Sequence, residues 1–245
     1  MRSGLFLDFD GVLCDSVAEC YVSSWIAFFE RYRGEQVAHV SIDHYRRFRA
    51  YRPYIRSGED YLLLHSLIMD NVPVGSQVDF DAAVARAGTE HMATYRALLY
   101  TVRDQLVQQS LEKWRALHTA YAGIPERLRV LARDPSVWIV STKRQEFIVR
   151  VLEGWGIRWP VDRISMPVSK SKMQIVESIV TAKKMTQALF VDDHEDDLEC
   201  RPEAPIECRL AAWGHVAPET LQSPRHELIQ LHELLTIMDA RDAKL

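Results

Sequence analysis

Two aspartates and a glycine end the first apolar segment of the chain, which reads Leu-Phe-Leu-Asp-Phe-Asp-Gly from Leu5 to Gly11. Removing a carboxylate from water is costly unless a cation or a hydrogen-bond donor compensates it, so acids at the end of a buried strand indicate a chemical role. Alternation along an extended chain puts Asp8 and Asp10 on the same side, where one can act on a substrate that the other hydrogen-bonds. Gly11 then lets the chain turn away without steric cost. The structural alternative is an acid pair in a loop or a helix cap.

A second acidic cluster follows the apolar segment 188–191 and contains Asp192, Asp193 and Asp197. Mg²⁺ prefers oxygen ligands, and two strand ends can supply them from opposite sides of one crevice. We therefore expect Asp193 to be a metal ligand, with Asp192 beside it. Asp197 lies about one helical turn further on and is expected to orient the metal's waters or nearby basic side chains. The alternative is a solvated acidic loop at a helix N-terminus.

Hydroxyl groups follow a third apolar segment, 137–140, in Ser141 and Thr142. A strand-to-helix junction also presents main-chain N–H groups, which together with a hydroxyl suit an anion such as phosphate. Of the two residues, Ser141 is the expected phosphate ligand. The alternative is a simple helix cap, the commoner use of serine and threonine at such positions.

Two lysines, Lys170 and Lys172, flank the start of a predicted helix. Ser171 and Gln174 form a capping-box pattern ahead of apolar positions, so the helix is expected to start near Lys172. A lysine there could pair with a phosphate and with the aspartate that attacks it. The capping box favours Lys172, whereas counting five residues forward to an apolar position favours Lys170, and we slightly prefer Lys170.

The segments that would position these side chains alternate between strand and helix. Each predicted strand is short, apolar and bounded by polar or glycine-containing stretches, and a helical pattern follows it. The predicted strands cover residues 5–9, 137–140, 163–166, 188–191 and 209–213. This alternation predicts an α/β fold with a doubly wound parallel sheet.

The strand signal disappears between residues 16 and 123, where apolar residues recur at helical spacing. This predicts an inserted all-α cap domain at 16–123 and an α/β core made of residues 1–15 and 124–245. The insertion begins just after the first strand, at the sheet edge where open sheets bind ligands, so it is placed to cover the site.

Composition excludes several classes of protein. The formal net charge of -4 gives no overall attraction to nucleic acid or to an anionic membrane. No apolar stretch approaches the roughly 20 residues of a membrane helix, and the N-terminus does not resemble a signal peptide. The four cysteines have no CxxC spacing and are expected to be free thiols. We therefore expect a cytoplasmic protein without nucleic-acid or membrane partners.

Four motifs follow one another along the chain: DFDGV, a strand ending in serine, a lysine, and a strand ending in Asp-Asp with a further aspartate. In this order they resemble the motifs of the haloacid dehalogenase-like (HAD) hydrolase superfamily. The resemblance covers roughly residues 1–15 and 125–215. It implies a Rossmann-like core and a helical cap after the first motif. The sequence departs from the family pattern in having Asp192 where a glycine is common, and in its second lysine.

The resemblance implies a two-step phosphatase reaction on a small phosphorylated metabolite. Asp8 would attack phosphorus to form an aspartyl-phosphate, and Asp10 would protonate the leaving oxygen and then activate water. Mg²⁺ would be held by Asp8, the main-chain carbonyl of Asp10, and Asp193, while Ser141 and a lysine bind the phosphate. Asp10 argues against haloacid dehalogenation, because the dehalogenating branch lacks this second aspartate.

The cap offers one suggestive segment for substrate recognition, residues 51–59, in which Arg52 and Arg56 stand beside aromatic residues and a glycine. Such arginines could reach an anionic substrate, although a solvated basic helix face is the alternative. Two other functions remain open: a phosphomutase with the same motifs, and a catalytically silent phosphate-binding or regulatory protein.

Overall fold

The computed structural model describes residues 3–36, 41–168 and 170–243. The chain divides into two compact units, Met1–Asp15 with Thr119–Leu245, and Ser16–His118. The first is an α/β unit, and the second is built of helices. The division falls at His118, slightly before the boundary at residue 123 that the sequence pattern suggests.

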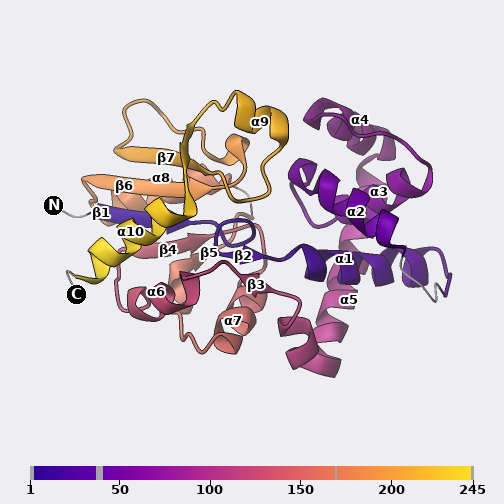
Figure 1. Cartoon of the computed structure of the whole chain (residues 1–245), viewed down its shortest axis with the longest axis horizontal. Coiled ribbons are helices and arrows are strands. Elements are labelled where there is room, and N and C mark those ends of the chain that lie inside the picture. Colours follow the sequence, from indigo (N-terminus) through magenta and orange to yellow (C-terminus); the bar gives the residue numbers. More distant parts are fainter. Residues whose placement is uncertain (1–2, 37–40, 169, 244–245) are drawn as a thin grey trace. The chain divides into compact units, whose positions relative to one another are not determined.

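In the described part of the α/β unit, six strands form one parallel sheet in the order β5-β4-β1-β6-β7-β8, which Figure 1 shows with helices around it. The strands are β1 (Ser3–Leu7), β4 (Val137–Val140), β5 (Ile164–Ser165), β6 (Gln187–Asp192), β7 (Ile206–Ala211) and β8 (Glu227–Ile229). The predicted doubly wound parallel sheet is confirmed, and its first strand lies inside the sheet between β4 and β6.

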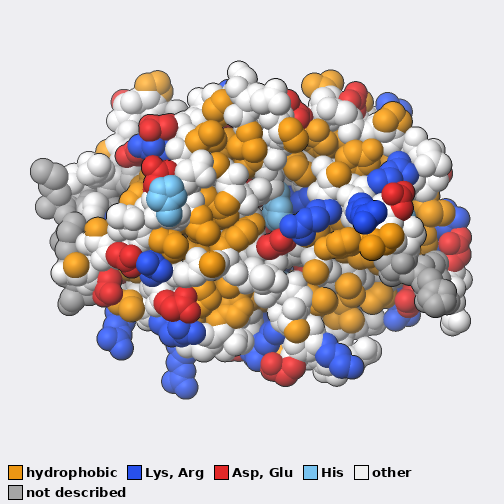
Figure 2. Space-filling view, viewed as in Figure 1, with side chains coloured by type: hydrophobic (Ala, Val, Ile, Leu, Met, Phe, Trp, Pro, Cys, Tyr) orange, Lys and Arg blue, Asp and Glu red, His pale blue; other side chains and the backbone are white. Residues whose placement is uncertain are grey.

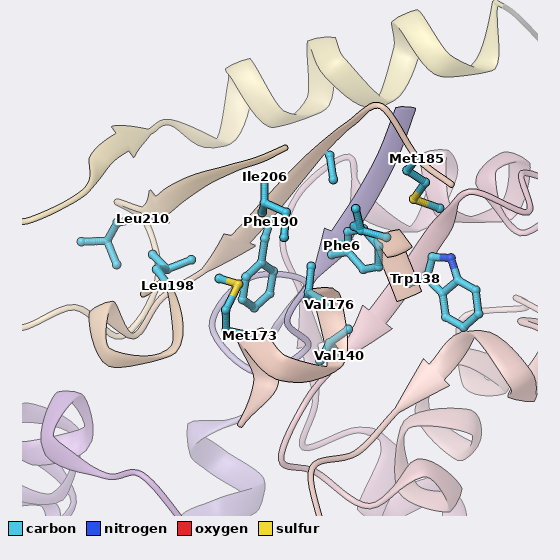
Figure 3. Packing of buried hydrophobic residues seen from close by; sticks show 12 residues of the cluster. Phe6, Trp138, Val140, Met173, Val176, Met185, Phe190, Leu198, Ile206 and Leu210 are labelled. Atoms are coloured by element: carbon cyan, nitrogen blue, oxygen red, sulfur yellow. The ribbon is translucent and has the colours of Figure 1, made fainter. Parts of the chain in front are cut away.

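Helices link the strands and cover both faces of the sheet. They are α6 (Ile124–Leu131), α7 (Gln145–Gly154), α8 (Lys172–Ala182), α9 (Pro218–Gln222) and α10 (Leu231–Asp242). The chain passes outward to β4 and β5 through α6 and α7, and it returns to β6 through α8 on the opposite face, since such crossovers are right-handed. Met173 and Val176 of α8 belong to the same buried apolar cluster as Phe6 of β1 and Phe190 of β6 (Figure 3). The strand order reverses at β1, which is where ligands bind in sheets of this kind.

Several predicted boundaries differ from those of the structure. Strand β1 ends at Leu7, so Asp8 already lies beyond it, and β7 begins at Ile206 instead of residue 209. Strand β8 is not among the predicted strands, and α10 follows it. With three residues, of which one is buried, β8 is too short to show the alternation that identifies a strand.

A two-stranded antiparallel ribbon joins the start and the end of the helical insertion. Strand β2 (Cys14–Asp15) pairs with β3 (Thr119–Ala120), and the Tyr121 N–H donates to the Leu13 carbonyl at 3.2 Å. The insertion therefore leaves and rejoins the α/β unit at one place, a few residues after Asp10.

All regular elements among the described residues of 16–118 are helical. They are α1 (Val17–Trp25), the π-helix η1 (Ile26–Tyr32), α2 (Ile42–Tyr51), the 3₁₀ helix η2 (Arg52–Tyr54), α3 (Asp60–Met69), α4 (Gln77–Ala87) and α5 (Thr89–Arg115). Most of α3 is buried, as its apolar sequence predicts. Glu19 of α1 accepts hydrogen bonds of 2.9 and 3.0 Å from the Arg103 guanidinium of α5, so a buried ion pair joins these two helices.

The surface carries charges of both signs. Figure 2 shows acidic and basic side chains distributed over the face in view, in keeping with the small formal net charge of -4. Within the described ranges, no helix is both long and apolar enough to span a membrane.

Candidate active site

The side chains expected to do chemistry follow neighbouring strands at the same edge of the sheet. In the register of the sheet, Leu7 of β1 lies beside Ile139 of β4 and Val191 of β6. The next residues along these strands lead directly to Asp8, to Ser141 and to the acidic cluster. Because all three strands are parallel, their carboxyl ends meet and bring the separate sequence motifs into one site.

Asp8 is buried at the centre of this edge, with 4% of its surface exposed. Its N–H donates to the Val191 carbonyl at 3.0 Å, which fixes the backbone of the residue onto β6. Oδ2 lies 3.1 Å from Lys172 Nζ, whereas Oδ1 is buried and no described residue donates a hydrogen bond of ordinary geometry to it. Burial raises the pKa of the Asp8 carboxyl, and the Lys172 ammonium opposes this shift.

Lys172 is the lysine that the structure places in the site. Its Nζ lies 3.1 Å from Asp8 Oδ2, 2.9 Å from Asp192 Oδ2 and 3.1 Å from Asp197 Oδ2. Burial alone would lower the pKa of this ammonium, but the three carboxylates raise it well above its ordinary value, so Lys172 is charged. The side chain of Lys170, which the sequence pattern led us to prefer slightly, is exposed.

The start of α8 explains why Lys172 occupies this position. The Ser171 hydroxyl accepts a hydrogen bond from the Gln174 N–H at 3.2 Å, and the Gln174 side-chain oxygen accepts one from the Ser171 N–H at 3.0 Å. The predicted capping box therefore exists. It makes Lys172 the first residue of the helix and directs its side chain to the end of the sheet.

Three buried carboxylates could hold a cation. Asp8, Asp192 and Asp193 each offer an oxygen, and these oxygens lie within 4.8 Å of one another. Asp192 is already engaged, since Oδ2 pairs with the lysine of α8 and Oδ1 accepts from the His194 N–H at 3.0 Å. Burial raises the pKa of Asp192 well above its ordinary value. Asp193 Oδ2 accepts from the His215 N–H at 2.7 Å.

Two glycines pack against the Asp193 side chain so closely that no larger residue fits. A Cβ atom at Gly11, where φ is +90°, would lie 1.8 Å from Asp193 Oδ2. A Cβ atom at Gly214 would lie 2.4 Å from Asp193 Cβ and 2.7 Å from the Gly11 carbonyl oxygen. Gly214 and His215 follow β7, and our sequence reasoning missed both. Their positioning role is visible only once β7 is placed beside β6.

Asp10 pairs with a second buried lysine, which was also missed. Lys143 Nζ lies 3.2 Å from Asp10 Oδ1 and 3.4 Å from Oδ2. The Lys143 N–H donates to the Ser141 hydroxyl oxygen at 3.4 Å, and Ser141 is buried, whereas Thr142 between them is exposed. The Ser141 side chain also lowers the pKa of Asp8. The loop after β4 therefore buries the side chains of Ser141 and Lys143 and leaves that of Thr142 exposed.

The two arginines expected to contact a substrate lie in the helical unit. The Arg52 guanidinium carbon lies 5.6 Å from the centre of the Tyr61 ring. Arg56 NH1 lies 3.1 Å from each carboxylate oxygen of Asp81. Each arginine thus has contacts inside its own unit.

Comparison with known proteins identifies the fold. No family model matches the chain, and no curated protein matches it in sequence. A hydrolase of the haloacid dehalogenase-like family from Streptococcus pneumoniae is similar in structure, with a TM-score of 0.58, 15% identity and 98% of each chain covered. A HAD-superfamily hydrolase of subfamily IA from Geobacter sulfurreducens has a TM-score of 0.52 and 15% identity, over 98% of this chain and 96% of that chain.

A third similar structure is described as a predicted phosphoglycolate phosphatase from Haemophilus somnus. It has a TM-score of 0.58 and 14% identity, over 95% of this chain and 96% of the other. The resemblance to HAD hydrolases is therefore confirmed at the level of the fold, across nearly the whole chain.

Proposed function

We propose that this protein is a Mg²⁺-dependent phosphatase that uses Asp8 as its nucleophile on a small phosphorylated metabolite. The observation that carries the proposal is the state of the Asp8 carboxylate. One oxygen contacts the Lys172 ammonium at 3.1 Å, and the other is buried and accepts no hydrogen bond of ordinary geometry from the described residues. A buried carboxylate oxygen without a donor is expensive unless a cation or a reacting atom meets it.

The donors at this edge of the sheet fit Mg²⁺. All are carboxylate oxygens, the ligand type that this ion prefers. Asp193 Oδ2 accepts a hydrogen bond from the His215 N–H at 2.7 Å, and the backbone of Asp8 is fixed by the hydrogen bond of 3.0 Å from its N–H to the Val191 carbonyl. We propose that Asp8, Asp193 and the main-chain carbonyl of Asp10 hold the ion, with Asp192 beside them. Bound there, Mg²⁺ would offset negative charge on the phosphoryl oxygens.

In the first step, a carboxylate oxygen of Asp8 forms a bond to phosphorus and the bond from phosphorus to the ester oxygen breaks. The leaving oxygen takes a proton from Asp10, so the product leaves as an alcohol instead of an alkoxide. Lys172 and the Ser141 hydroxyl bind phosphoryl oxygens and hold the phosphorus atom in reach of Asp8.

In the second step, water attacks the phosphorus of the aspartyl-phosphate. Asp10, now a carboxylate, accepts a proton from the water, and the bond between phosphorus and Asp8 breaks. Inorganic phosphate is released and both aspartates return to their starting forms.

The helical unit is proposed to act as the cap that selects the substrate. Its support is topological, since the unit is inserted a few residues after Asp10 at the ligand-binding end of the sheet. Arg52 and Arg56 are the side chains proposed to contact an anionic group of the substrate. Small phosphorylated carboxylic acids, sugars and nucleotides are the classes to test first.

The test is release of inorganic phosphate from a panel of phosphate esters, with Mg²⁺ and with EDTA. The Asp8→Asn variant should lose the activity, whereas Asp162→Asn, which changes an exposed aspartate of the same unit, should keep it. Mg²⁺-dependent release that survives in Asp8→Asn would contradict the proposal. Turnover that requires an added bisphosphate would indicate a phosphomutase instead.

A further inference from the structure

A second buried lysine, Lys143, contacts Asp10, the second aspartate of the first motif. The side chain of Lys143 is 2% exposed, and its Nζ lies within 3.2 and 3.4 Å of the two oxygens of Asp10, whose side chain is 17% exposed. The carboxylate therefore keeps access to solvent while the ammonium lies in the protein. Lys172, which contacts Asp8, is instead the first residue of α8.

The burial of this ammonium requires an explanation. A lysine side chain is long and flexible, and it ordinarily extends its charged end into water. Burial of the charge is costly unless a partner compensates it, and the contact with Asp10 provides such compensation. The Lys143 N–H is tied to the Ser141 hydroxyl at 3.4 Å, which fixes the lysine's backbone next to the proposed phosphate ligand.

We propose that Lys143 is a positioning residue for Asp10. It contacts both oxygens of the Asp10 carboxyl group and so fixes where this group stands relative to the ester oxygen that leaves. Lys143 itself transfers no proton: the proton moves from Asp10 to the leaving oxygen, and the bond from phosphorus to that oxygen breaks. This inference rests on the proposed phosphatase function.

The role can be tested by comparing two leaving groups. Para-nitrophenolate is stable as an anion and needs no proton, whereas the alkoxide from glycerol phosphate does. Single-turnover experiments, in which the enzyme is in excess over the ester, measure the rate of the first step alone. Lys143→Met should slow the alkyl ester by about 10²–10³-fold, in the range of lost acid catalysis, and the aryl ester by less than about tenfold. Lys143→Arg should restore part of the loss on the alkyl ester, because it keeps a donor to Asp10.

A double variant separates positioning from structure and from substrate binding. If Lys143 acts through Asp10, then Asp10→Asn/Lys143→Met should be no slower on the alkyl ester than Asp10→Asn alone. Equal loss on both esters, a further loss in the double variant, or a weakened affinity for both esters would overturn the inference. A wild-type protein that releases phosphate from no ester of the panel, these two included, would overturn the proposed function itself, and this inference with it.

Discussion

Lys172 Nζ lies 3.1 Å from Asp8 Oδ2 and within the same distance or less of Asp192 and Asp197. One buried positive charge thus faces three carboxylates, and a fourth, Asp193, lies next to two of them. With all four carboxyl groups ionised the site would carry an excess of negative charge, which is unfavourable unless another cation is present, and burial accordingly raises the pKa of Asp8 and Asp192. This imbalance supports a divalent metal at the site.

Removal of the lysine should destabilise the fold. Lys172→Met leaves the carboxylates of Asp8 and Asp192 buried without their cation, and the free energy of unfolding should fall by about 3–5 kcal/mol. Asp192→Asn in the same chain should recover part of this loss without recovering phosphatase activity. Urea unfolding at neutral pH measures the change.

Lys170→Met is the matched control, because the Lys170 side chain is exposed and its loss should leave stability unchanged. Equal stability of Lys172→Met and the wild type would show that the three ion pairs do not support the site.

Mg²⁺ binding should depend on Gly214. An alanine there would put its Cβ atom 2.4 Å from Asp193 Cβ, so this side chain must move. We expect Gly214→Ala to weaken Mg²⁺ binding by about 10–100-fold, as is typical when a residue that supports a metal ligand is changed. Titration calorimetry with Mg²⁺ measures the affinity. In Gly75→Ala, where the nearest atom would lie 3.4 Å away, the affinity should not change, and unchanged binding in Gly214→Ala would contradict the proposed role of Asp193.

The sequence predicts those site residues that directly follow an apolar strand. Asp8, Ser141 and Asp193 each follow a recognisable apolar strand, and parallel strands bring their carboxyl ends to one edge. The choice between Lys170 and Lys172 needed geometry, because a shift of two residues at a helix start changes which side chain points into the sheet edge.

Other parts of the site had no sequence signal. Gly214 and His215 follow a different strand, β7, and contact Asp193 through their backbone. Their residue types therefore give no indication of a role. Lys143 follows the predicted strand 137–140 without a recognisable motif, and its partner Asp10 is far away in sequence. These residues meet only through tertiary packing, which residue patterns do not describe.

The helical unit should lose stability in acid through a pair of buried histidines. His44 Nε2 lies 2.9 Å from His65 Nδ1, and His65 Nε2 lies 2.9 Å from the Ser24 hydroxyl. Burial lowers the pKa of His44 to about 4 and that of His65 well below its ordinary value. Both are therefore neutral in the folded protein, whereas in the unfolded chain they bind protons below about pH 6.5.

The stabilisation is therefore complete above about pH 6.5 and is lost as the pH falls toward about 4. His44→Gln should reduce this loss by on the order of 1–2 kcal/mol, since one titrating group is removed. Urea unfolding across this pH range measures the free energy of unfolding of the variant relative to that of the wild type. Burial raises the pKa of Asp60 to about 6, which has the opposite effect on stability, but this effect is common to both proteins and cancels in the difference. The exposed His232 offers the control His232→Gln, and equal pH profiles for both variants would refute the assignment.

The central claim, that Asp8 is the nucleophile, can be tested by trapping the intermediate. Asp10→Asn should still react with para-nitrophenyl phosphate, whose leaving group needs no proton, but it should hydrolyse the intermediate slowly. We predict a burst of about one nitrophenolate per enzyme molecule in the presence of Mg²⁺. Mass spectrometry of the quenched protein should then find a phosphoryl group on Asp8. A burst that persists in Asp8→Asn/Asp10→Asn, or a phosphoryl group on another residue, would contradict the account.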